Sequence, residues 1–330
     1  QHPSAQCSRE LQGEAAPIGL RYWGGVHDIF DKRVALITGK GGVGRTTVTA
    51  ALARAAAARG IRVLVTEIAE PEGDYTPLAR IYGRDNLPVE PVQVAPGVMG
   101  CVLWYRRGHE HFFHRVIPVR AVVKAAMRSA ALRKLLDSAP SFREMGVFNH
   151  LFALGEERRA DGEYKYELIL LDMPASGHTL GLTGLRRRLL ELAPTGPIAQ
   201  VLDDGRAYFV DPKVTGAYVV TLPETLPVTE CLELIEGLHD HKTPVGGIIV
   251  NRVLEDPFTP AERAALAPHA EENLFGMARF KSIPESAKAL AKLQASTDQP
   301  IHEVPEFPLQ ERELIDAIAG VLGERDVAAA

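Results

Sequence analysis

A glycine-rich stretch at positions 39–47 carries the clearest chemical signal in this chain of 330 residues. It follows an apolar run at 34–38 and opens a segment of helical composition at 46–59. Glycines adopt backbone angles that let several N–H groups converge on one anion, and the dipole of a following helix favours negative charge at the same point. The stretch therefore predicts a phosphate-binding loop. A glycine-rich turn of purely structural use is the alternative.

The loop departs from the usual pattern G-x-x-x-x-G-K-[ST] at one position, because Arg45 stands where lysine is expected. Arginine can bind phosphate oxygens through its planar fork, but it replaces a compact charge with a wide one. Thr46 occupies the position from which a hydroxyl reaches Mg²⁺. The residues expected to bind the nucleotide are Gly39, Lys40, Gly41, Gly42, Val43, Gly44, Arg45, Thr46 and Thr47.

Two acidic residues end apolar runs elsewhere in the chain, Glu67 after 62–66 and Asp172 after 166–171. Ligands of α/β proteins gather at the carboxyl ends of the strands, so both carboxylates are expected to face the nucleotide. Asp172 is predicted to hold Mg²⁺ together with Thr46. For Glu67, an ordinary loop acid is the alternative. The loop after Asp172 contains Gly177, a candidate contact to the γ-phosphate; a structural turn is the alternative there.

The order of apolar runs predicts an α/β fold in which a mostly parallel sheet is flanked by helices. Further strands are expected at 97–104, 216–221 and 246–251, and helices at 227–239, 259–272, 284–294 and 310–322. A proline-rich connector is expected at 300–308. Asn251, at the end of a strand, is a candidate adenine contact. We expect one domain at 32–330, preceded by an extension at 1–31.

The segment 105–160 has apolar residues at helical spacing and is too long for a single crossover helix, so it predicts a helical subdomain inserted between strands. Packing against the core is the default interpretation of its apolar stripes, and a groove for a client protein is the alternative. His109, His111 and His114 lie in the same segment. Their spacing fits metal binding poorly, and a solvated polar surface is the preferred interpretation.

Composition limits the other classes of function. The net charge of −5 and pI near 6.2 do not indicate a nucleic-acid-binding surface. Three separated cysteines give neither a disulfide framework nor a zinc-site spacing. No apolar run reaches the ~18 residues of a membrane span, and the first 31 residues lack the pattern of a signal peptide. A cytoplasmic protein without an integral membrane segment is therefore expected.

Taken together, these motifs resemble the ArsA-type ATPases, which comprise arsenite-pump ATPases and the targeting ATPases for tail-anchored membrane proteins. The resemblance spans about 33–322 and places the chain near the wider deviant Walker A group of dimeric P-loop NTPases that includes MinD. The similar segments are K-G-G-V-G-R-T-T at 40–47, D-M-P-A-S-G-H at 172–178, T-L-P-E with T-E at 221–230, V-N-R at 250–252 and P-E-F-P at 305–308.

The resemblance implies roles for particular residues. Lys40 would reach the nucleotide of a partner subunit, Glu67 would orient the hydrolytic water, and Asn251 and Pro308 would lie beside the adenine. ATP and Mg²⁺ would be the cofactors. The catalytic group would be Lys40, Glu67 and Asp172.

Several family features are missing or altered. Glu67 replaces the aspartate of the first switch, and both the C-x-x-C zinc pair and the cysteines that bind metalloid are absent. We therefore expect an ATP-hydrolysing dimeric switch protein, paired with itself or with a paralogous ATPase and acting on an unknown client. A nucleotide-binding but hydrolysis-poor subunit or scaffold is the first alternative. A membrane-positioning ATPase like MinD is less well supported, since the acidic segment 310–322 lacks a basic face.

Overall fold

The computed structural model describes residues 27–70, 73, 76–117, 119–138, 140–174, 196–272 and 275–324. In this part of the chain, eight strands form one sheet in the order β3-β4-β2-β5-β1-β6-β7-β8. All neighbouring strands are parallel except the pair β3–β4. The strands are β1 (Val34–Thr38), β2 (Val63–Ile68), β3 (Val92–Ala95), β4 (Val98–Leu103), β5 (Leu168–Asp172), β6 (Thr215–Thr221), β7 (Val245–Val253) and β8 (Ile301–Pro305).

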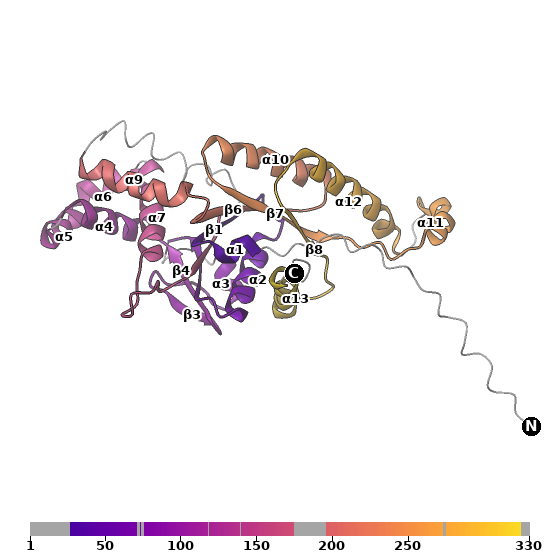
Figure 1. Cartoon of the computed structure of the whole chain (residues 1–330), viewed down its shortest axis with the longest axis horizontal. Helices are drawn as coiled ribbons and strands as arrows, with labels where there is room; N and C mark the ends of the chain where they lie inside the picture. The colour runs from indigo at the N-terminus through magenta and orange to yellow at the C-terminus, as the bar shows by residue number, and fades with distance from the viewer. Residues whose placement is uncertain are drawn as a thin grey trace, which may run out of the picture.

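Helices cover both faces of the sheet and one end of it (Figure 1). They are α1 (His27–Asp31), α2 (Arg45–Ala58), α3 (Pro77–Ile81), α4 (Tyr105–Val116), α5 (Arg120–Arg128), α6 (Ala130–Ser138), α7 (Pro140–Gly155), α9 (Pro197–Val210), α10 (Thr225–Asp240), α11 (Pro260–Leu266), the short 3₁₀ helix η1 (Ala267–His269), α12 (Met277–Ser296) and α13 (Glu311–Gly323). The mostly parallel α/β architecture predicted from the sequence is therefore confirmed.

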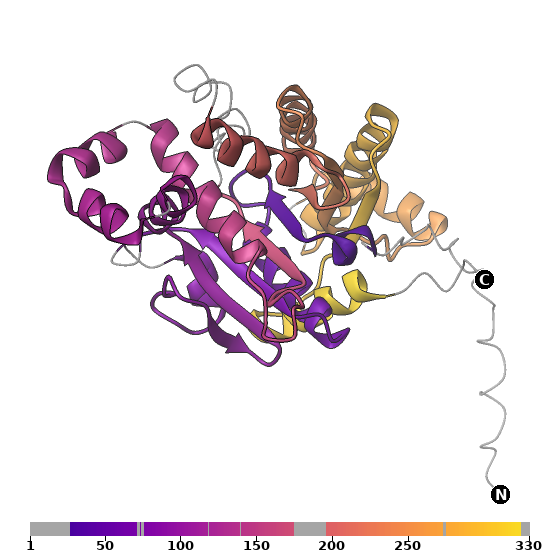
Figure 2. The same ribbon diagram turned by 60° about the vertical axis from the view of Figure 1, so that its left-hand side comes forward.

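The core has two parts, one on each face of the sheet. Strands β1, β5 and β6 are buried along their whole length, as expected for parallel strands that are covered on both sides. On one face α2, α3 and α13 pack with α1, and on the other α7, α9, α10 and α12 pack against the same strands. Figure 2 shows these helices on opposite sides of the sheet. The central strands thereby lie between two layers of helices, and the glycine-rich loop follows directly from one of them, β1.

Helices α4 to α7 lie in the range where the sequence predicts a helical subdomain, and with α9 they form the group that projects from one end of the sheet (Figures 1 and 2). Of the predicted extension at 1–31, residues 1–26 lie outside the described residues. Helix α1 packs Ile29 and Phe30 into the core.

Two segments differ from the elements expected. The prediction of a proline-rich connector at 300–308 is wrong for its first half, because residues 301–305 form the edge strand β8 beside β7. An edge strand tolerates proline, since one row of its backbone groups has no sheet partner. The helix expected at 284–294 begins earlier, at Met277, and contains Pro284 in its interior.

Candidate functional site

The glycine-rich loop lies between β1 and α2, near the middle of the sheet. Gly39, Gly42 and Gly44 have φ angles of 147°, 86° and 89°, which side chains other than glycine rarely adopt. A Cβ on Gly39 would lie 2.3 Å from the carbonyl oxygen of Val220, and one on Gly44 would lie 2.4 Å from Nδ2 of Asn251. Glycine is thus favoured by backbone angle at all three positions, and at Gly39 and Gly44 it is also required by space.

The loop leads into the N-terminus of α2, where a cluster of backbone N–H donors is open. Gly44 caps this helix without a side-chain hydrogen bond, and the first bond of the helix runs from the Val48 amide to the Gly44 carbonyl at 3.0 Å. The amides of the first turn, at Arg45, Thr46 and Thr47, therefore have no partner within the helix. Such amides, aligned with the helix dipole, suit a phosphate group.

Strand order places the two predicted acids beside this loop. β5 is paired with β1 on one side and β2 on the other, and Glu67 and Asp172 are register partners across β2 and β5. Both carboxylates are buried, with 5% and 6% of their residues' surface exposed. The sequence-based expectation that strand ends bring them together is consistent with this register.

The negative charge of Asp172 has few compensating contacts for a buried carboxylate. Burial raises its pKa to about 6, while a hydrogen bond with the Thr46 side chain and the charge of Arg45 act in the opposite direction. Its Oδ1 atom has no hydrogen-bond partner among the described residues. A buried carboxylate oxygen of this kind, next to a threonine hydroxyl, fits the ligand preferences of Mg²⁺, which uses one or two protein oxygens together with phosphates and water.

Arg45 points back across the sheet rather than out of the loop. Its Nη1 donates to the carbonyl of Met173, the residue after Asp172. Burial lowers the pKa of Arg45, and the negative charge of Asp172 partly offsets this effect. The guanidinium thus joins the start of α2 to the residue that follows β5.

Glu67 is engaged with α3. Its carboxylate accepts hydrogen bonds from the Thr76 hydroxyl and from the backbone amides of Leu78, at 3.2 Å, and Ala79, at 3.3 Å. It therefore satisfies donors at the N-terminus of a short helix. Burial raises the pKa of Glu67, and these three hydrogen bonds counteract the rise.

Lys40 is half exposed and lies 3.6 Å from Oε1 of Glu230, on the first half of α10. Exposed pairs of this kind contribute little, typically about 0–1 kcal/mol. The lysine is thus held by a weak contact within the chain.

Asn251 serves as a brace for the loop. Its Nδ2 donates to the Val43 carbonyl at 3.0 Å, and its Oδ1 accepts from the Arg252 amide at 3.0 Å. Pro308 is exposed in the turn after β8. The Glu306 amide in this turn donates to the Val253 carbonyl at 3.0 Å, so Pro308 lies near the end of the strand that carries Asn251. Gly177, the remaining candidate site residue, lies outside the described residues, as does His178.

The interpretation of the three histidines as a solvated polar surface is wrong for His109, of which 1% is exposed, whereas His114 is exposed. The Nε2 atom of His109 lies 2.7 Å from the Phe142 carbonyl. His150, which the sequence analysis did not single out, stacks against His111, and burial lowers its pKa to about 3. No group of three or more metal-ligating side chains occurs in the described part of the chain.

Two further residues belong to the site. Thr76 contacts Glu67, and the pair Thr76-Pro77 is a recognisable helix start, because threonine is a common N-cap and proline is favoured at the first helical position. Glu230 contacts Lys40, and it was visible in the sequence only as part of the family-like T-E pair. In the residues that the structure describes, no helix is long and apolar enough to cross a membrane.

Comparison with known proteins agrees with this arrangement. The family model of the CobQ/CobB/MinD/ParA nucleotide binding domain matches residues 34–300. The ATPase BagA of Mycobacterium tuberculosis is 27% identical over 240 residues, which cover 71% of this chain and 69% of BagA. A protein of Aquifex aeolicus, named arsenical pump-driving ATPase 2, is 24% identical over 273 residues. These residues cover 70% of this chain and 85% of that protein.

Proposed function

Since this chain belongs to the family of CobQ/CobB/MinD/ParA nucleotide binding domains, we propose that it is an ATP-binding and ATP-hydrolysing switch protein, related to the ArsA-type ATPases, that works as a dimer. The observation that carries the proposal is the cluster of open amides, Thr46 and the poorly compensated Asp172 at one loop. Relatives named as ATPases support the same activity.

In this proposal the amides of the loop and of the first turn of α2 hold the phosphates, and Arg45 adds positive charge. Thr46 and Asp172 hold Mg²⁺, which supplies charge neutralisation for the phosphate oxygens. Asn251 fixes the shape of the loop through Val43. Asn251 and Pro308 remain the candidate contacts on the adenine side, and Gly177 remains the candidate γ-phosphate contact.

Glu67 is the candidate for orienting the attacking water. Its present hydrogen bonds to Thr76, Leu78 and Ala79 use both carboxylate oxygens. These bonds take up most of the acceptor capacity of Glu67, so we infer that α3 moves and frees the carboxylate when the nucleotide is bound. Loss of these contacts on ATP binding is one way in which nucleotide binding can change the conformation of the rest of the protein.

The test of nucleotide binding is calorimetric titration of the purified chain with ATP and ADP, with and without Mg²⁺. Binding of one ATP per chain that is strengthened by Mg²⁺ is expected. Absence of binding to any of these nucleotides contradicts the proposal.

Dimer-dependent catalysis gives a separate prediction, centred on Lys40. Turnover per subunit is expected to rise with protein concentration, and Lys40→Ala is expected to remove this rise and to lower maximal turnover by at least about tenfold, because a lysine that neutralises the partner's phosphates is lost. The measurement is steady-state ATP hydrolysis over a wide range of protein concentrations.

The matched control is Glu230→Gln, which removes the partner of Lys40 within the subunit while keeping the lysine. This variant is expected to retain the rise in turnover. If Lys40→Ala and Glu230→Gln lower turnover equally, the lysine acts through its own subunit and the proposed exchange between subunits is wrong.

The hydrolysis-poor subunit remains the second candidate. The contact between Arg45 and the Met173 carbonyl favours it, because this contact holds the guanidinium at the residue that follows β5. The substitution Arg45→Lys distinguishes the two candidate functions. For a working ATPase we expect turnover to change by less than about tenfold, since lysine and arginine both supply the charge while differing in geometry. A larger gain indicates that Arg45 suppresses hydrolysis in this chain and supports the second candidate. Nucleotide affinity, measured in parallel, distinguishes lost binding from lost chemistry.

A further inference from the structure

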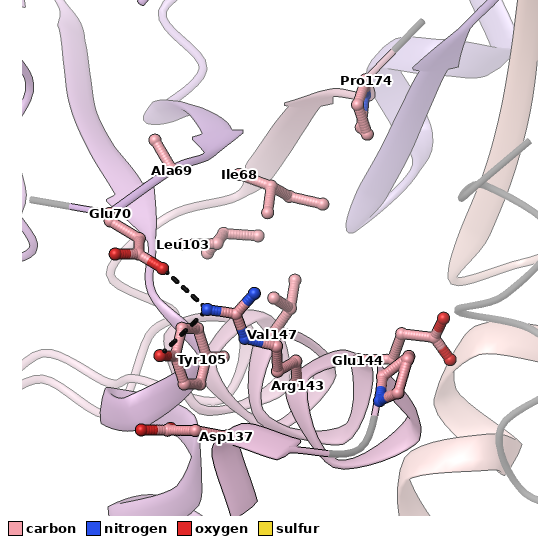
Figure 3. Close-up of a pocket in the computed structure, with 11 residues that line it drawn as sticks. Ile68, Ala69, Glu70, Leu103, Tyr105, Asp137, Arg143, Glu144, Val147 and Pro174 are labelled. Atoms are coloured by element: carbon pink, nitrogen blue, oxygen red, sulfur yellow. Dashed lines mark hydrogen bonds and ion pairs between the residues drawn. The ribbon is translucent and has the colours of Figure 1, made fainter. Parts of the chain in front are cut away.

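A cavity of about 550 Å³ lies between the sheet and the helical segment, apart from the glycine-rich loop. Its lining comes from the ends of β2 and β4, the residue Pro174 after β5, and helices α4, α6 and α7 (Figure 3). No residue of 39–47 lines it. Its size is within the range of about 300–1,000 Å³ that is typical of small-molecule sites.

The inner walls of the cavity are apolar. Ile68 and Leu103 come from neighbouring strands of the sheet, Val147 comes from α7, and Pro174 closes the side nearest β5. Leu103 and Val147 belong to the hydrophobic core on this face, so these walls are fixed by packing. A preformed apolar surface favours an apolar body in its occupant.

One polar cluster borders these walls. Arg143 donates through Nη2 to Glu70 at 2.9 Å and to the Tyr105 hydroxyl at 3.3 Å. Its guanidinium carbon lies 4.5 Å from the centre of the Tyr105 ring. Figure 3 shows the guanidinium between the helix and the strand ends, with both of these hydrogen bonds at one nitrogen. Among the described residues, the other N–H groups of Arg143 have no hydrogen-bond acceptor, so they are available to an acceptor atom in the cavity.

The charges at the edge of the cavity are already paired. Arg143 faces Glu70, and Asp137 faces Arg106 at 2.8 Å. A charged group on the occupant would lose its hydration without gaining an unpaired counter-charge from these two pairs. An uncharged occupant fits best.

We propose that this cavity binds one small, uncharged and mainly apolar molecule, whose single acceptor oxygen is held by Arg143. The apolar body would lie against Ile68, Leu103 and Val147. The acceptor would use the N–H groups of Arg143 that Glu70 and Tyr105 leave open.

The position of the cavity connects its occupant with the nucleotide site, an extension that rests on the proposed function. Ile68 to Glu70 directly follow Glu67, and Pro174 is two residues beyond Asp172. The occupant therefore contacts the ends of the two strands that carry the buried acids. Occupancy of the cavity and the binding of Mg-ATP are expected to influence each other, as any two ligands that act on one conformational equilibrium must.

The binding experiment uses Nile red, an uncharged apolar dye with a carbonyl oxygen, and follows its fluorescence on titration with the full chain. One dye per chain is expected to bind. Val147→Trp, which fills the cavity from α7, is expected to weaken binding at least about tenfold. Ala69→Phe fills it from the strand side and serves if Val147→Trp does not fold. The anionic dye anilinonaphthalene sulfonate is expected to bind more weakly.

The control is the double variant Val119→Ser/Val122→Ser, which removes exposed apolar side chains of the helical segment outside the cavity. It is expected to bind Nile red like the original protein. The proposal is overturned if the folded cavity-filling variants retain full binding, if the control loses it, or if the anionic dye binds as tightly as Nile red.

Coupling is read from the same titration with saturating Mg-ATP. The dye affinity is expected to change by at least about threefold, and the same factor is expected for the effect of dye on ATP affinity. Unchanged dye affinity in a protein that binds ATP overturns the coupling alone. Dye binding in a protein that fails to bind ATP overturns the proposed function and leaves the cavity as a binding site.

Discussion

Replacing Asp172 with asparagine is expected to stabilise the protein in the absence of nucleotide and to abolish its ATP turnover. Burial raises the pKa of Asp172 from its ordinary value of 3.8 to about 6. The ionised side chain at pH 7.5 therefore opposes folding, by roughly 3 kcal/mol from this pKa difference. Asparagine avoids ionisation but brings an amide close to Arg45, so we expect a net gain of about 1–3 kcal/mol in the free energy of unfolding.

The direction in which pH changes this contribution to the free energy of unfolding follows from the raised pKa. Because the pKa of Asp172 is higher in the folded state than in the unfolded chain, its contribution favours folding at low pH and is lost as pH rises from about 4 through about 6. Glu67, whose pKa is also raised, contributes in the same direction. The stability difference between Asp172→Asn and the original protein should therefore be larger at pH 7.5 than at pH 5.

Urea unfolding at both pH values, without Mg²⁺ and nucleotide, measures this difference. Asp85→Asn, a substitution at an exposed position, is the control and should be nearly neutral at both. Turnover of Asp172→Asn is expected to fall by at least about 100-fold, because a proposed Mg²⁺ ligand is lost. An Asp172→Asn protein that is less stable at pH 7.5, or that hydrolyses ATP normally, contradicts this account.

Gly44→Ala is expected to damage both stability and nucleotide binding. The added methyl group would lie 2.4 Å from Nδ2 of Asn251, at a residue whose φ of 89° is itself unfavourable for alanine. Asn251 must then move and release the Val43 carbonyl. We expect a loss of about 2–4 kcal/mol from backbone strain and the broken contact together, and ATP affinity reduced at least about tenfold.

Substitutions at two other glycines distinguish the effect of backbone strain from the effect of the clash with Asn251. Gly60 has a φ of 79° and Gly42 a φ of 86°, and a Cβ on either meets no atom within 4 Å. Gly60→Ala, beyond the end of α2, should lower stability by about 1 kcal/mol and leave ATP binding unchanged. Gly42→Ala should lower stability by the same amount. If it also weakens ATP binding, the cause lies in the loop itself, to which Gly42 belongs. Equal stability for all three variants would mean that Asn251 does not brace the loop.

The sequence predicted the central part of the fold well, for identifiable physical reasons. β1, β5 and β6 are continuous apolar runs because both of their faces are buried, and such runs stand out in any sequence. The glycine-rich loop is similarly visible, because its backbone angles can hardly be formed by other residues.

The less regular elements were not visible in the same way. β3 and β8 lie at the two edges of the sheet and are only partly buried, so they lack an apolar run. The prolines next to β8 resemble a connector when tertiary pairing is unknown. α9 was not predicted, and it packs against α4 and α7, elements far from it in the chain.

Contacts within the site depended on distant partners. The sequence indicated that Glu67 and Asp172 end strands and face one site, but not that these strands are neighbours, that Glu67 binds the start of α3 or that Arg45 reaches Met173. Their roles in nucleotide chemistry stay predictions, as does the boundary of the helical subdomain.

The contact between Asn251 and Val43 also constrains how the protein is made. The two residues are 208 positions apart in the chain, so a ribosome must synthesise most of the protein before the loop receives its brace. Until β7 has docked beside β6, the loop lacks the support that holds Gly44 and Val43 in place. A nascent or truncated chain that ends before β7 should therefore fail to capture nucleotide, and nucleotide binding then marks chains whose synthesis has passed this point.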